Sequence, residues 1–80
     1  MSPEQSRAAR GWLGWSQDDL AKRARVSLST VRDFEKGRHV PIEATLNAMR
    51  AAIENAGIRL VFADDGTPQG IASDRDASAA

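Results

Sequence analysis

The sequence contains no cysteine, which excludes a disulfide framework and a thiolate metal site. Its single histidine and scattered carboxylates form no metal-ligand pattern, so we expect neither a metal nor a cofactor. No apolar stretch approaches the roughly 20 residues of a membrane span, and the N-terminus lacks the pattern of a secretory signal. We therefore expect a cytoplasmic protein with no membrane partner.

The chain also lacks net charge, but its charges are unevenly distributed. Residues 1–40 contain eight lysines and arginines against five acidic residues, a balance of +3, whereas residues 41–80 contain three against six, a balance of −3. A basic half and an acidic half fit a DNA-facing side and a side that faces solvent or a partner. No nucleophile–base pair and no phosphate-cradling glycine loop is present, so we do not expect an enzyme.

Eighty residues form one domain, and so short a chain buries a modest share of its surface and gains from self-association. Its hydrophobic fraction of 41% and charged fraction of 28% are ordinary for a globular protein. We therefore expect one folded domain that forms a homodimer.

Capping residues and apolar spacing predict four helices. Ser2, Ser16 and Ser27 are placed to cap helices that begin at Pro3, Gln17 and Leu28. We expect these helices to span about 3–13, 17–24 and 28–36, and a fourth, opened by Pro41, to run towards Gly57. The expected inward side chains are Ala9, Trp12, Leu13, Leu20, Ala21, Ala24, Val31, Phe34, Ile42, Leu46, Met49 and Ile53, with Trp15 packed beside them.

After Gly57 the pattern changes to a β-branched and aromatic run, which predicts a strand over Ile58–Phe62. Turn residues follow at 64–68, and residues 70–71 could return as a short second strand to make a hairpin. The prediction is thus a mainly α fold, with a helical domain at 1–57, a strand or hairpin at 58–72 and a disordered tail at 73–80.

A lone strand leaves its N–H and C=O groups unpaired. Its partner could be a second copy, or the second strand together with a second copy, and for either arrangement we expect Ile58, Leu60 and Phe62 to contribute to dimerisation. The alternative is that the strand packs on the fourth helix of its own chain.

Residues Gln17 to Arg38 read as two short helices joined by a tight turn, which is a helix-turn-helix. Residues 13–21, Val26-Ser27, 31–37 and the stretch from Pro41 onward resemble the phage repressor and Cro-like (XRE-type) helix-turn-helix regulators. The resemblance covers residues 4–56 and implies a lambda-repressor-like four-helix fold that binds double-stranded DNA.

The resemblance also implies roles for individual residues. Base contacts would come from Ser27, Leu28, Ser29, Arg32 and Asp33, and phosphate contacts from Gln17, Arg25, Lys36, Arg38 and His39. Arg10 and Glu35 would form a structural salt bridge. Simpler alternatives are that Ser27 only caps its helix, that Arg32 and Asp33 lie on an ordinary solvated face, and that His39 is merely solvated.

The sequence departs from the family at two points. Arg25 occupies a turn position that is usually glycine because its φ is often positive, so the turn should be strained by about 1 kcal/mol. A phosphate contact by Arg25 could offset this cost. The strand also takes the place of the usual fifth helix, and we propose it as the substitute dimerisation element.

Two functions remain open at this stage. The first is a sequence-specific transcriptional regulator that binds a partly palindromic operator as a dimer. The second is a protein-interaction module, such as an antitoxin or antiactivator, that keeps this fold but binds a protein through its acidic half and the exposed strand.

Overall fold

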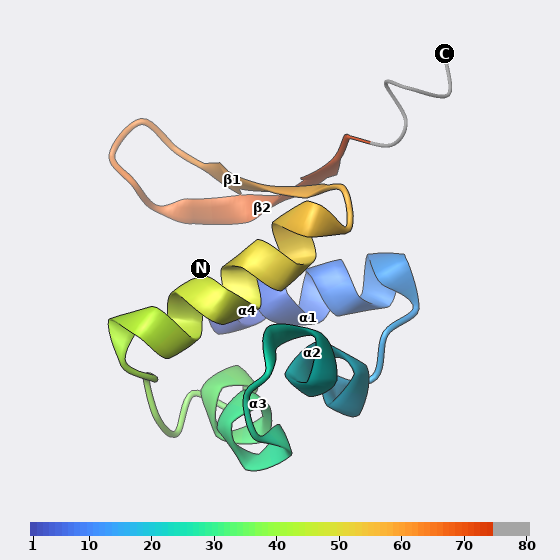
Figure 1. Ribbon diagram of the computed structural model, residues 1–80. Helices are drawn as coiled ribbons and strands as arrows, with labels where there is room; N and C mark the ends of the chain where they lie inside the picture. Colours follow the sequence, from blue (N-terminus) through green and yellow to red (C-terminus); the bar gives the residue numbers. More distant parts are fainter. Residues whose placement is uncertain (75–80) are drawn as a thin grey trace.

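The computed structural model describes residues 1–74 as four helices followed by an antiparallel hairpin (Figure 1). The elements are α1 (Pro3–Leu13), α2 (Gln17–Ala24), α3 (Leu28–Glu35), α4 (Glu43–Asn55), β1 (Ile58–Phe62) and β2 (Pro68–Ser73). The predicted mainly helical fold with a C-terminal hairpin is confirmed. The second strand is longer than predicted and includes Ser73, which we had assigned to the tail; the rest of that predicted tail, from residue 75, lies outside the described residues.

Serine caps fix the beginnings of the first three helices. The hydroxyl oxygens of Ser2 and Ser16 accept from the backbone N–H three residues later, and the side chain of that later residue accepts from the serine N–H in return. Ser27 caps α3 by the first of these bonds, which its hydroxyl oxygen accepts from the Thr30 N–H. All these bonds satisfy backbone donors that a helix leaves unpaired in its first turn.

The start of α4 differs from the sequence prediction. Ile42 is the N-cap rather than a member of the inward stripe, its side chain is 73% exposed, and no side chain caps the helix. The preceding Pro41 is buried instead. Because Ile42 lies before the first helical residue, the 3.6-residue periodicity that would turn it inward does not apply to it.

One apolar core joins all four helices to the hairpin. Its buried members are Ala9, Leu20, Ala21, Ala24, Val31, Phe34, Met49, Ile53, Ile58 and Leu60. Trp12, predicted to face inward, is 59% exposed. The buried residues of α1 are Gln5, Ser6 and Ala9. Trp12 lies about 60° around the helix from Ala9, on the side away from Ser6.

The hairpin pairs within its own chain and packs on α1 and α4. Ile58 and Leu60, predicted to contribute to dimerisation, are instead buried in the chain's own core, and Phe62 is half-buried against it. The reason is strand alternation: every second residue of β1 points at the helices. Two of the three side chains expected at a dimer contact are therefore buried within the monomer.

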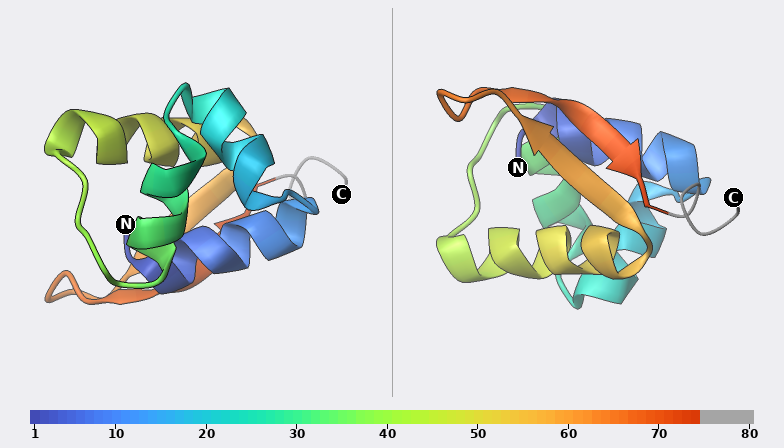
Figure 2. Two further views of the ribbon diagram at one scale, coloured as in Figure 1. Left: turned by 90° about the horizontal axis from the view of Figure 1, so that it is seen from below. Right: turned by 90° about the horizontal axis from the view of Figure 1, so that it is seen from above.

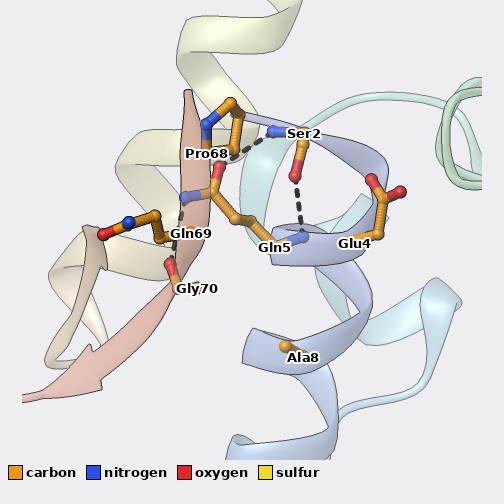
Figure 3. A pocket seen from close by; sticks show the side chains of 7 residues that line it. All are labelled: Ser2, Glu4, Gln5, Ala8, Pro68, Gln69 and Gly70. Carbon is orange, nitrogen blue, oxygen red and sulfur yellow. Dashed lines mark hydrogen bonds between the residues drawn. The ribbon is translucent and has the colours of Figure 1, made fainter. Parts of the chain in front are cut away.

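Gln5 connects α1 to both strands of the hairpin. Its Nε2 donates to the carbonyl oxygen of Val61 at 3.0 Å. The same Nε2 donates to the Gly70 carbonyl at 3.0 Å, and Oε1 accepts from the N–H of Ser2 at 2.9 Å (Figure 3). The side chain is 2% exposed and has a partner for each polar atom. An open groove of about 600 Å³ lies beside it, between the start of α1 and β2.

The hairpin and α3 lie on opposite sides of the molecule. Figure 2 shows α3 towards the viewer from below and the hairpin towards the viewer from above. The helix α3 packs on α2 and α1, whereas the strands pack on α1 and α4. The loop from α3 to α4 runs along one edge between these two sides in both views. This arrangement leaves the outer face of α3 free of other elements.

Candidate nucleic-acid interface

The turn between α2 and α3 is built on Arg25 in the left-handed conformation, with φ 59° and ψ 43°. Its N–H donates to carbonyls of the last turn of α2, and the N–H of Val26 donates to the carbonyl of Ala21 at 3.0 Å. Arg25 is the one non-glycine residue with positive φ among residues 1–74. The backbone thus adopts the geometry expected for glycine here, while the exposed arginine side chain projects from the turn.

An exposed polar stripe runs along the outer side of α3. Ser29, Arg32 and Lys36 are spaced by three and four residues, so they share one face, and all three are exposed. Val31 and Phe34 are buried on the opposite side. Of the other predicted base contacts, Leu28 is partly buried against the core and Asp33 is half-buried. The structure therefore presents Ser29 and Arg32 most openly at this face.

Hydroxyl groups cluster at the beginning of α3. The Ser27 Oγ accepts from the Thr30 N–H at 3.1 Å and lies 2.7 Å from the Thr30 hydroxyl and 3.2 Å from the Ser29 hydroxyl. Ser27 thus has the capping role that was the simpler alternative for it. Thr30 was not predicted to take part, although a hydroxyl residue three positions after a capping serine is a signal for it.

Glu35 at the end of α3 links α1, α2 and α3 through one carboxylate. Arg10 donates from Nη2 at 2.7 Å and from Nε at 2.9 Å, and the Ser6 hydroxyl donates at 2.6 Å. The Gln17 amide donates at 3.1 Å, and Arg7 donates to the Glu35 backbone carbonyl. The expected partners Arg10 and Glu35 are in contact, whereas Ser6 and the bond from Gln17 were not foreseen.

The hydrogen bonds around Glu35 keep it charged although it is 3% exposed. Burial alone would raise the pKa of Glu35, but donors on Arg10, Ser6 and Gln17 outweigh it and hold that pKa below its ordinary value. The same hydrogen bond raises the pKa of Arg10. The ends of α1 and α3 are therefore joined by a buried ion pair that persists at neutral pH.

Comparison with known proteins gives the chain a family. Residues 5–56 match the family described as "Helix-turn-helix domain", which covers more than half of the chain. The chain belongs to this helix-turn-helix family. It is also 37% identical over 57 residues to multiprotein-bridging factor 1 of Schizosaccharomyces pombe, across 71% of this chain and 36% of that protein. The chain thus spans about a third of the length of that curated relative.

Membership of the helix-turn-helix family places this domain among folds of a kind that bind DNA. Within residues 1–74, no group of three or more histidines and carboxylates is placed to hold a metal. No helix in this part of the chain is long and apolar enough to cross a membrane.

Exposed basic residues lie before and after α3 along the chain. Arg25 in the turn and Lys36, Arg38 and His39 after α3 are all exposed. Arg23 on α2 lies over the Trp15 ring at 4.4 Å from its centroid, so this guanidinium stacks on its own chain. Gln17 gives one amide hydrogen to Glu35, and a primary amide has a second to offer.

Proposed function

We propose that this helix-turn-helix chain is a sequence-specific transcriptional regulator that acts as a dimer on a partly palindromic operator. The observation that carries the proposal is the exposed polar stripe of α3, formed by Ser29, Arg32 and Lys36. The exposed side chains of Arg25 and Arg38 lie before and after this helix. A helix with a free polar face of this kind fits the major groove of B-DNA.

Each side chain has a contact suited to its chemistry. Arg32 can donate to guanine O6 and N7, and the Ser29 hydroxyl can bond to either kind of base-edge group. Arg25, Lys36 and Arg38 supply charge to phosphates on either side of the groove, and His39 and Gln17 add hydrogen-bond donors. The buried Glu35 network holds α3 at a fixed angle to α1 and α2, so these contacts keep one register.

Dimerisation belongs to the proposal because one copy provides modest attraction to DNA. The basic half of the chain has a balance of only +3, and non-specific affinity depends on the number of phosphates neutralised. Two copies on half-sites about one helical turn apart double both the charge and the number of base contacts.

A gel-shift experiment with duplexes selected from a random pool tests this function. We expect Arg32→Ala to relax sequence preference, and Lys36→Ala to weaken binding to every duplex and to reduce the salt slope by about one. The control is Arg59→Ala, because Arg59 is an exposed cation on the hairpin, away from α3. The proposal is wrong if all three variants bind as the unmodified protein does.

One alternative function has specific support. The name of the relative, multiprotein-bridging factor 1, describes a protein that bridges other proteins. This chain also has zero net charge and an acidic second half, both of which suit a protein partner better than a phosphate backbone. If no duplex binds at physiological salt, a protein-interaction module such as an antitoxin or antiactivator becomes the better proposal.

A further inference from the structure

Two large aliphatic side chains are exposed on the loop between α4 and α3, the proposed recognition helix. Val40 is 75% exposed and Ile42 is 73% exposed, while Pro41 between them is buried. Ile42 has an extended backbone conformation, with φ −60° and ψ 157°. The buried proline anchors the loop, and the aliphatic side chains before and after it are exposed to solvent.

The position of α3 limits where a second copy can lie. Both recognition helices of a dimer must face the same duplex, so the two-fold axis has to run roughly from the α3 side to the hairpin side. Because the hairpin lies opposite α3, a contact through the outer face of the hairpin would turn the two copies of α3 away from each other (Figure 2). The contact must therefore lie on an edge of the molecule.

The edge that carries the α3–α4 loop suits this contact. The loop leaves α3 directly and runs along that edge (Figures 1 and 2). The two longer extents of the molecule are 38 and 29 Å, so two copies in edge contact along these directions have centres 29 to 38 Å apart. One turn of DNA, about 34 Å, falls within that range.

We infer that Val40 and Ile42 form the contact between two copies of this chain bound to adjacent half-sites. This inference rests on the proposed function and identifies its dimer surface. The same loop carries Lys36 and Arg38, and the positive charges of two such loops repel each other in free solution. DNA phosphates neutralise these charges, so the contact forms on the duplex and appears as cooperative binding.

Single cysteines test the contact directly, because the chain contains none of its own. We expect Ile42→Cys to cross-link with a short bismaleimide on a selected duplex with two half-sites, and not on the same duplex with one half-site scrambled. The matched controls are Arg59→Cys on the hairpin and Trp12→Cys on α1, both at exposed positions. Cross-linking through either control, or through none of the three while all bind the duplex, overturns the inference.

Cooperativity gives a second measurement on the same duplexes. We expect Val40→Ser/Ile42→Ser to keep its affinity for a single half-site and to lose the cooperativity of the full site, which is typically 5–150-fold for coupled sites. Trp12→Ser should keep both. If the double variant remains cooperative, or the unmodified protein binds half-sites independently, the surface is assigned wrongly although the proposed DNA binding stands. If the unmodified protein binds no duplex, the proposed function fails, and the inference fails with it.

Discussion

Replacing Arg10 by methionine should destabilise the domain strongly. The change keeps most of the aliphatic volume but removes the guanidinium that donates to Glu35 from two nitrogens, and it leaves a carboxylate that is 3% exposed with only Ser6 and Gln17 as donors. Breaking a buried ion pair from one side costs about 3–5 kcal/mol. A domain of 80 residues has a total stability of about 4–12 kcal/mol, so the loss would be a large fraction of it.

Thermal unfolding followed by circular dichroism measures this effect. A loss of 3 kcal/mol should lower Tm by about 12–24 °C in a domain of this size. The matched control is Lys22→Met, because Lys22 pairs with Asp18 at 2.9 Å on the exposed surface, where ion pairs contribute little. If Arg10→Met shifts Tm no more than Lys22→Met does, the Glu35 network does not hold α1 to α3.

Three further outcomes are expected. Arg25→Gly should stabilise the domain by about 0.5–1 kcal/mol in urea unfolding, because it removes the strain of a left-handed arginine. The same change should weaken duplex binding in gel shifts, because it removes an exposed cation. A loss of stability would show that the turn is not strained. Gln5→Met should cost about 2–3 kcal/mol and speed hydrogen exchange in the hairpin before that in α3, since both strand carbonyls lose a donor; equal acceleration in both elements would contradict the tether. Because the pKa of Glu35 is held below its ordinary value, its contribution to stability is complete above that ordinary value of about 4.3 and is lost as the pH falls through the lowered value. The urea midpoint of the unmodified protein should therefore fall more steeply in acid than that of Glu35→Gln, and parallel curves would refute this.

Features that depend on local rules were predictable from the sequence. A capping serine followed by a helix-forming stretch is a short-range pattern, so the first residues of α1, α2 and α3 were placed as the structure has them. The positive φ at Arg25 was also anticipated, because the geometry of the turn fixes the backbone whichever residue occupies it. These features depend on bonds between residues no more than four or five positions apart.

Features that depend on packing between distant segments were not predictable. Trp12 and Ile42 both have the right spacing to be inward, but which side of α1 is covered depends on where the other elements pack, and Ile42 is excluded because α4 begins one residue later. The role of Gln5 could not be predicted, since its carbonyl partners are 56 and 65 residues away in the sequence. Burial of Ile58 likewise follows from tertiary packing, which strand propensity alone does not specify.

The bonds from Gln5 to the hairpin also bear on how the chain folds. They join the beginning of the domain to its last strand, and contacts of such long sequence separation slow folding because a large loop must close before they form. During synthesis α1 leaves the ribosome first, and its Gln5 amide then has no strand to bond. The helix-turn-helix can form through local contacts between α2 and α3, but the bond from Gln5 to Gly70 can form only after β2 has been synthesised.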